Sequence, residues 1–259
     1  MESKSLILDA FKLDGKTALV TGASAGLGAA IAIALAEAGA DVACHGNTRS
    51  PDATCEEIRS LGCVAHPLTG DLSKSETSRA IFAETLEAFG RVDILVNNAG
   101  TIARAPAVEF SEEDWATVIE VNLTSVFRLS QLAGRQMIER RAGGKIINIA
   151  SLLSFQGGIT VPAYAAAKGG VAQLTKALAN EWASKGVNVN AIAPGYMRTD
   201  NTKALQADET RNRQILERIP AGRWGEPRDL AGASVFLASA ASDYIHGHVL
   251  VVDGGWMGR

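Results

Sequence analysis

Short, mainly apolar runs alternate with longer amphipathic segments along the first half of the chain. The apolar runs show no polar alternation, which is typical of strands buried on both faces of a parallel sheet. The segments between them repeat apolar residues at helical spacing. This alternation predicts a parallel sheet with right-handed crossovers. The expected strands lie at 16–20, 41–45, 63–71 and 91–100, and the expected helices at 29–40, 56–59 and 76–89.

The second half continues the alternation with two long helices. An S-x-x-D capping pattern beginning at Ser111 predicts one amphipathic helix over 111–141. Pro162 suits the first turn of a second helix over 162–185. We expect these helices to lie side by side and to offer a contact surface for a twofold homo-oligomer. The remaining expected elements are strands at 143–151, 186–195 and 248–255 and a helix at 229–239.

Composition narrows the class of protein. The 259 residues, 47% hydrophobic and 20% charged, fit one large α/β domain over 1–259 better than two small ones. A net charge of -3 argues against nucleic acid or an anionic membrane as a partner. No apolar run is long enough to span a bilayer. Charges interrupt the apolar patch of the N-terminal stretch 1–16, and no cleavage site follows it, so we expect a cytoplasmic protein.

The cysteines and histidines give no sign of a metal or redox site. Cys44, Cys55 and Cys63 are odd in number and match no ligand or redox spacing, so we expect free buried thiols. The four histidines also lack zinc-type spacing. We therefore predict no metal and give the histidines no catalytic role.

A glycine-rich turn joins the first expected strand to the first expected helix. The stretch TGASAGLG at 21–28 places Gly22 where a tight turn is needed, Gly26 where the backbone can approach a pyrophosphate, and Gly28 where helix packs on strand. The helix N-terminus would present free N–H groups to phosphate. Such a turn can also be purely structural, but its place between strand and helix favours a nucleotide.

The end of the second strand bears on the choice of cofactor. In dinucleotide-binding folds an acidic residue there holds the ribose 2′-hydroxyl, whereas an arginine accommodates a 2′-phosphate. Here the strand end reads HGNTR, with Gly46 at the expected position of the acid, followed by Asn47 and Arg49. Arg49 is either a phosphate ligand or a solvated loop residue. The pattern is compatible with NAD(H) and NADP(H) and favours NADP(H).

Polar or glycine-containing segments follow nearly every expected strand, and these ends meet at one edge of a parallel sheet. The convergence predicts a nucleotide cleft. After the strand at 186–195, the polar segment 196–228 is too short for a second domain and is expected to form a mobile lid over the substrate.

A hydroxyl, a phenol and an ammonium group follow the strand at 143–151. Tyr164 and Lys168 are four residues apart on an expected helix, so they share a face. A free phenol has a pKa near 10, and a nearby ammonium lowers it toward the range useful for acid–base catalysis. Ser151, at the strand end, could hold a carbonyl oxygen for Tyr164 to protonate. The Y-x-x-x-K pattern alone is weak and depends on the other motifs.

Together these motifs resemble the short-chain dehydrogenase/reductase family over nearly the whole chain. The resemblance implies a single Rossmann-like, doubly wound domain with a seven-stranded parallel sheet, usually tetrameric, that moves hydride between a nicotinamide and a carbonyl or alcohol. It implies that Tyr164 is the general acid/base, Ser151 orients substrate, Lys168 tunes the phenol and binds ribose, and Asn122 holds a relay water. The implied cofactor-binding set adds Gly22, Ser24, Gly26, Leu27, Gly28, Asp71, Leu72, Asn98, Ala99, Gly100, Pro194, Gly195, Met197 and Thr199 to Tyr164 and Lys168.

Several stretches of the second half, such as RIPAGRWGEPRDL, resemble family members that interconvert keto and hydroxy forms of deoxy sugar acids, such as 2-dehydro-3-deoxy-D-gluconate. A sugar acid calls for an arginine and amide groups in its pocket. Arg104, Arg211 and Gln156 are the candidates, although Arg211 is also explained as an exposed lid charge. We keep two rivals: reduction of an acyl-carrier-bound 3-ketone or another carbonyl, and a non-catalytic nucleotide sensor, against which the complete Ser151, Tyr164 and Lys168 set argues.

Overall fold

The computed structural model describes residues 6–259 and contains one seven-stranded, all-parallel sheet in the order β3-β2-β1-β4-β5-β6-β7. The first five residues, part of the N-terminal stretch from which we predicted the absence of a signal peptide, lie outside the described residues. The strand order reverses between β1 and β4, where doubly wound sheets open a crevice. The strands are β1 (Thr17–Val20), β2 (Asp41–Gly46), β3 (Ala65–Thr69), β4 (Ile94–Asn97), β5 (Gly144–Ile149), β6 (Val187–Pro194) and β7 (Val249–Val252).

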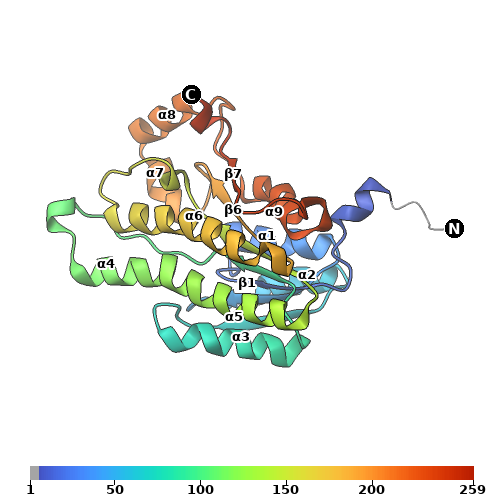
Figure 1. Ribbon diagram of the computed structural model, residues 1–259. Helices are drawn as coiled ribbons and strands as arrows, with labels where there is room; N and C mark the ends of the chain where they lie inside the picture. The colour runs from blue at the N-terminus through green and yellow to red at the C-terminus, as the bar shows by residue number, and fades with distance from the viewer. Residues whose placement is uncertain (1–5) are drawn as a thin grey trace.

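Helices cover both faces of this sheet and give a layered α/β/α arrangement (Figure 1). Helices α1, α2 and α9 pack on one face, and α3, α5 and α6 on the other. The single-domain Rossmann-like fold predicted from the sequence is confirmed. The helices are α1 (Gly26–Glu37), α2 (Asp52–Ser60), α3 (Ser75–Phe89), α4 (Glu112–Ile119), α5 (Ser125–Arg140), α6 (Pro162–Trp182), α7 (Lys203–Ala207), α8 (Glu209–Arg218) and α9 (Ala231–Ala238).

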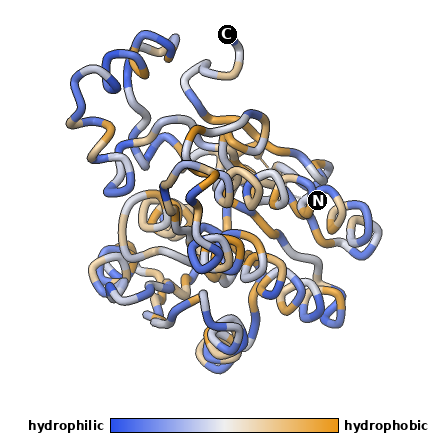
Figure 2. The backbone as a smooth tube through the Cα atoms, turned by 90° about the vertical axis from the view of Figure 1, so that its left-hand side faces the viewer, coloured by the Kyte–Doolittle hydropathy of each residue, from blue (hydrophilic) through white to orange (hydrophobic). Residues whose placement is uncertain are grey.

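The core forms as two apolar layers, one on each side of the sheet. Strand β6 is buried along its whole length, and its two polar residues, Asn188 and Asn190, donate to backbone carbonyl oxygens of the segment before β7. Helix α1 is apolar on most faces because β1, α2 and α9 surround it. Figure 2 shows apolar positions concentrated in the body of the molecule, whereas the protruding top, which holds α7 and α8, is largely hydrophilic.

Several predicted elements differ from the structure in their bounds, and one differs in kind. The strands expected at 91–100 and 248–255 are shorter, Ile94–Asn97 and Val249–Val252. The third strand ends at Thr69, two residues early, because Gly70 and Asp71 turn toward α3. The single helix predicted over 111–141 is interrupted by a π-helical turn, Glu120–Thr124, that separates α4 from α5. Such turns insert one residue into a helix and often mark functional sites. This one carries Asn122, so the wider turn changes the direction in which that side chain points.

Other sequence expectations are partly met. Cys44 and Cys55 are free and buried, but Cys63 is only half-buried, so its predicted burial is wrong. Over residues 6–259, none of the helices has the length and hydropathy needed to cross a membrane. In the same residues, no cluster of His, Cys, Asp or Glu has the makings of a metal site.

Candidate active site

A cleft of about 1060 Å³ opens at the carboxyl ends of the strands and extends beneath α8. It brings together most of the predicted residues. Arg49, Met197 and Asn122 are the predicted residues that do not line it. The predicted residues in its wall are Gly22, Ser24, Gly26, Leu27, Gly28, Asn47, Asp71, Leu72, Asn98, Ala99, Gly100, Arg104, Ser151, Gln156, Tyr164, Lys168, Pro194, Gly195, Thr199 and Arg211.

The glycine turn after β1 has no room for side chains. Gly22 has a φ of +67°, and a Cβ there would lie 2.9 Å from Cα of Ala99. A Cβ on Gly28 would collide with the carbonyl oxygen of Gly22. Ala25, which precedes α1, offers no side-chain cap, so the first N–H groups of the helix are left without this partner. The turn therefore presents bare backbone to the cleft, as a phosphate site requires.

Thr21 and Asn98 hold this turn against the end of β4. The Thr21 Oγ1 accepts hydrogen bonds from the backbone N–H groups of Asn98 and Ala99, each at 3.0 Å. The Asn98 side-chain amide donates to the carbonyl oxygens of Thr21 (2.8 Å) and Gly22 (3.1 Å). Sequence reasoning missed Thr21 and did not foresee this supporting role of Asn98. The signal was their position at the ends of two strands that turn out to be neighbours.

His45 is a second residue that sequence reasoning missed. Its ring is buried between the glycine turn and the loop after β3 and also lines the cleft. Nε2 lies 2.9 Å from the Gly70 carbonyl oxygen, which can only accept, so Nε2 carries the proton. Nδ1 then accepts a long, 3.5 Å contact from the N–H of Gly22. Burial lowers the pKa of His45, which keeps this neutral arrangement.

The end of β2 has no space for an acidic side chain. A Cβ on Gly46 would collide with the carbonyl oxygen of Arg49 and lie 3.3 Å from Cδ of Pro51. Asn47 reaches the cleft wall. Arg49 is exposed and does not line the cleft, so its assignment to the cofactor site stays a prediction. The following turn at Pro51 directs the chain into α2 and away from the cleft.

Ser151, Tyr164 and Lys168 come together at the end of β5. Ser151 precedes a short 3-10 turn and accepts a hydrogen bond from the N–H of Leu153 at 3.2 Å. Its hydroxyl is also a hydrogen-bonding neighbour of the Tyr164 phenol. Lys168 lies one turn along α6, and its Nζ donates to the Ile149 carbonyl oxygen at 2.6 Å, 5.5 Å from the centre of the Tyr164 ring. The predicted trio is therefore assembled.

Burial controls the protonation of both groups on α6. It raises the pKa of Tyr164, while the Ser151 hydrogen bond and the charge of Arg104 offset only part of the rise. Burial also lowers the pKa of Lys168 to about 8. The expected lowering of the phenol's pKa by Lys168 is wrong for this geometry, because burial is the dominant influence and the ammonium is turned toward Ile149. At neutral pH the phenol stays protonated.

Asn122 lies behind the cleft wall. Its side-chain nitrogen donates to the carbonyl oxygens of Thr101 and Val118, each at 2.8 Å. Its Oδ1 is buried without a partner among residues 6–259. The Asn122 side chain therefore ties the π-helical turn to the loop after β4.

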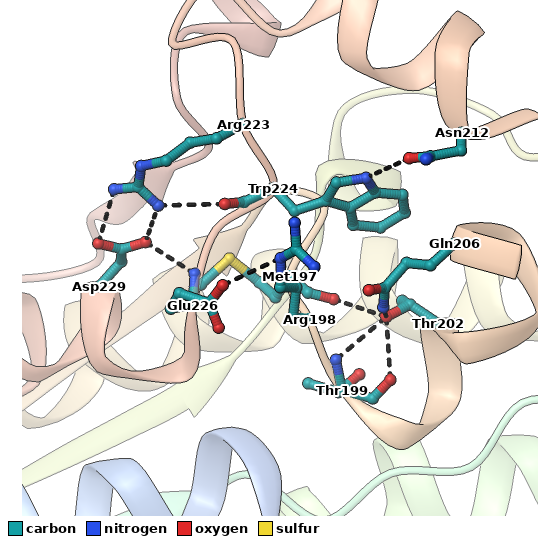
Figure 3. A network of polar contacts seen from close by, with 10 residues as sticks. All are labelled: Met197, Arg198, Thr199, Thr202, Gln206, Asn212, Arg223, Trp224, Glu226 and Asp229. Carbon is teal, nitrogen blue, oxygen red and sulfur yellow. Dashed lines mark hydrogen bonds and ion pairs between the residues drawn. The ribbon is translucent and has the colours of Figure 1, made fainter. Parts of the chain in front are cut away.

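The lid is anchored at its base by polar contacts (Figure 3). Arg223 forms a two-point ion pair with Asp229, at 2.6 and 3.0 Å, and Arg198 pairs with Glu226 at 3.0 Å. Met197 is buried against Gly225 in this base and does not line the cleft, so its place beside the nicotinamide stays a prediction. Trp224, 1% exposed, donates from its indole N–H to Asn212 of α8 at 2.7 Å.

Three arginines, Arg104, Arg211 and Arg218, give the substrate end of the cleft a positive character. None of them takes part in an ion pair formed by residues 6–259, whereas the arginines at the base of the lid are all paired. The cleft carboxylates are otherwise engaged: Asp71 accepts from Ser73, and Asp200 pairs with Lys203. Sequence reasoning missed Arg218, which only the lid's fold brings to the cleft.

Comparison with known proteins agrees with this geometry. A family model described as Enoyl-(Acyl carrier protein) reductase matches residues 22–257. The chain is 57% identical to the 2-dehydro-3-deoxy-D-gluconate 5-dehydrogenase of Bacillus subtilis, covering 97% of this chain and 98% of that protein. It is 54% identical to the Escherichia coli protein of that name, covering 98% and 100%.

A solved structure from Agrobacterium tumefaciens, described as a candidate 2-deoxy-D-gluconate 3-dehydrogenase with bound NADP, superposes with a TM-score of 0.91 at 56% identity. The match covers 96% of this chain and 99% of that one. These matches span almost the whole fold, including the glycine turn, the end of β5 and the lid. The chain belongs to the short-chain dehydrogenase/reductase family.

Proposed function

We propose that the protein is an NADP-dependent oxidoreductase that interconverts a keto and a hydroxy group on a deoxy sugar acid, with 2-dehydro-3-deoxy-D-gluconate as the substrate. The carrying observation is that Ser151 and Tyr164 share one cleft with three arginines that lack acidic partners in the described chain. A proton donor beside uncompensated positive charge suits a substrate that carries both a carbonyl and a carboxylate.

The cleft fits a dinucleotide. The turn at Gly22 and Gly28 keeps clear the space that a Cβ would fill, and the first turn of α1 supplies N–H groups for a pyrophosphate. Asp71 and Leu72 also line the cleft, and we assign them to the adenine of the cofactor. The lack of space for a carboxylate at Gly46, together with Asn47 in the wall, supports NADP(H) over NAD(H). The NADP-bound relative agrees with this preference.

In the reducing direction, Ser151 orients the substrate carbonyl by donating a hydrogen bond to its oxygen. The bound cofactor supplies the hydride. Tyr164 donates its proton to the same oxygen, and its raised pKa keeps that proton in place at neutral pH. Lys168, whose Nζ donates to the Ile149 carbonyl oxygen, binds the ribose of the cofactor. It also returns a proton to Tyr164 by way of the relay water that Asn122 holds. In the oxidising direction the phenolate accepts the proton, so oxidation should require higher pH.

The remaining site residues have supporting roles in this proposal. Arg104, whose charge acts on Tyr164, and Gln156 contact the substrate near its reacting end. The segment 196–228 is the lid. Its hinge lies where the backbone N–H of Arg198 donates to the carbonyl oxygen of Gly225. Arg211, exposed and bonded to Gln214, meets the substrate only as the lid closes.

We also propose a cytoplasmic homotetramer. The family resemblance and the side-by-side packing of α4 and α6 support this proposal. Trp115 of α4 and Phe127 of α5 are 45% and 40% exposed, which suits burial against another subunit. Light scattering after gel filtration tests the subunit number: a species of four times 27.1 kDa is expected, and a monomer would refute it.

The test of function is absorbance at 340 nm with purified protein and 2-dehydro-3-deoxy-D-gluconate, whose C5 carries a hydroxyl group, with NADP⁺ or NAD⁺. Rapid reduction of NADP⁺ and slower reduction of NAD⁺ are expected. Activity with NAD⁺ alone would refute the cofactor assignment. Reduction of 3-ketoacyl substrates by NADPH without oxidation of the sugar acid would favour the acyl-carrier rival. Cofactor binding with no turnover of any alcohol or carbonyl would favour a nucleotide sensor.

A further inference from the structure

We propose that Arg218, held over the ring of Trp256, binds the carboxylate of the sugar acid. This inference rests on the proposed function and assigns one cleft arginine to one end of the substrate. Both residues lie away from the Ser151 and Tyr164 pair in sequence, one at the end of α8 and the other in the C-terminal turn. Both nevertheless line the same cleft.

Arg218 is oriented before any substrate arrives. Its guanidinium carbon lies 4.0 Å from the centre of the Trp256 ring, a cation–π contact. Trp256 is only 5% exposed and packs with Ile215, Ile219 and Tyr196. A stacked guanidinium keeps its N–H groups free at the edge, where a carboxylate can accept two hydrogen bonds. Because the side chain is already ordered, binding loses less conformational entropy.

The charge of Arg218 is uncompensated. Other lid arginines have acidic partners: Arg213 with Glu217 and Arg223 with Asp229, for example. Arg218 takes part in none of the ion pairs among residues 6–259. The indole N–H of Trp256 is likewise buried with no acceptor in this part of the chain.

The shape of the substrate favours Arg218 over the other two cleft arginines. In 2-dehydro-3-deoxy-D-gluconate the carboxylate is at C1, four bonds from a reacting carbon at C5. Arg104 acts electrostatically on Tyr164 and so belongs to the reacting end. Arg211 bonds to Gln214 at 3.1 Å and, like Arg218, is exposed, but within residues 6–259 it makes no cation–π contact. Arg218 is the cleft arginine that an aromatic ring holds in place.

The test pairs two substrates with five proteins. The kcat/KM of wild type, Arg218→Met, Arg213→Met, Arg104→Met and Arg211→Met is measured with NADP⁺ for 2-dehydro-3-deoxy-D-gluconate and for its C1 amide, which keeps the reacting C5 hydroxyl and removes the charge. Arg213 is the matched control because it lies on the same helix and outside the cleft. The wild type and Arg213→Met should prefer the acid by about tenfold or more. Arg218→Met should lose that preference, mainly through KM, and turn over the amide nearly as well as wild type does.

Equal losses on acid and amide in Arg218→Met would show that the residue only supports the lid, and an undiminished preference for the acid would also overturn the proposal. Loss of the preference in Arg104→Met or Arg211→Met instead would assign the carboxylate to that residue. These outcomes leave the sugar-acid function standing. Inactivity of the wild type on both acid and amide would instead refute the proposed function itself.

Discussion

Gly28 offers a sharp test of how the glycine turn is built. A Cβ there would lie 2.7 Å from the carbonyl carbon of Gly22 and would collide with the oxygen of that carbonyl. Ordinary carbon contacts need about 3.5–4.0 Å, so Gly28→Ala must displace either α1 or the turn. The side-chain amide of Asn98 lies in the same space and has no free volume to yield.

The expected magnitude follows from two opposed effects. Overpacking costs about 1–3 kcal/mol, whereas Ala gains about 0.5–1 kcal/mol over Gly inside a helix. The net loss of unfolding free energy should be about 1–2 kcal/mol. Displacement of Gly22 should also disturb the proposed pyrophosphate site and weaken NADP⁺ binding by about tenfold or more, equivalent to about 1.4 kcal/mol.

Urea unfolding and a fluorescence titration with NADP⁺ measure both effects. Gly232→Ala on α9 is the matched control, because a Cβ there meets nothing within 4 Å. It should raise stability by up to about 1 kcal/mol and leave the Kd for NADP⁺ unchanged. If Gly28→Ala proved as stable as wild type and bound NADP⁺ equally well, the close packing assigned to this turn would be wrong.

Three further predictions concern charge and the lid. Because burial lowers the pKa of Lys168 from 10.5 to about 8, the unfolded chain binds more protons between these values. The free energy of unfolding should therefore rise by about 2 kcal/mol between pH 8 and 10 because of this residue. Urea unfolding of Lys168→Met should show no such rise. If the unfolding free energies of wild type and Lys168→Met changed in parallel with pH, the prediction would be wrong. Burial alone would raise the pKa of Asp93, but the Thr17 N–H, Arg140 and Arg91 lower it overall, so the stability that this carboxylate gives the fold should be lost as pH falls below about 4. In thermal melts, Asp93→Asn should be less stable than wild type at pH 7 and should lose less stability in acid. An unchanged acid sensitivity would count against this prediction. Asn212→Ala leaves the buried indole N–H of Trp224 unpaired, a cost of about 1–3 kcal/mol. The variant should be cleaved faster within 196–228 in limited proteolysis, with little change in the Tm of the whole protein. An unaltered rate of cleavage would mean that the lid is anchored elsewhere.

The order of strands and helices could be predicted from the sequence because hydrophobic periodicity is a local property. The glycine turn and the Ser151, Tyr164 and Lys168 set were predictable for the same reason, since each lies within a short stretch of chain. The motifs that follow these strands lie close together, because the carboxyl ends of parallel strands lie at one edge of the sheet. The seven-stranded sheet follows the pattern that the family resemblance implied.

The features that sequence reasoning missed depend on contacts between distant segments. Thr21 supports Asn98 because β1 and β4 are neighbours, and His45 bridges Gly22 and Gly70 because β2 lies between β1 and β3. The π-helical turn at Asn122 likewise depends on its bond to the loop after β4. Burial, which reverses the expected shift of the pKa of Tyr164, is a property of the assembled cleft.

The most direct test of the central claim compares wild type with Tyr164→Phe in two assays on the same preparations. Removing the phenolic hydroxyl should leave the Kd for NADPH nearly unchanged, because the proposed phosphate and adenine contacts lie elsewhere in the cleft. Oxidation of 2-dehydro-3-deoxy-D-gluconate should fall by about 10²–10⁴-fold, the usual contribution of a general acid or base. Turnover close to that of wild type in Tyr164→Phe, with the cofactor still bound, would show that Tyr164 is not the general acid/base.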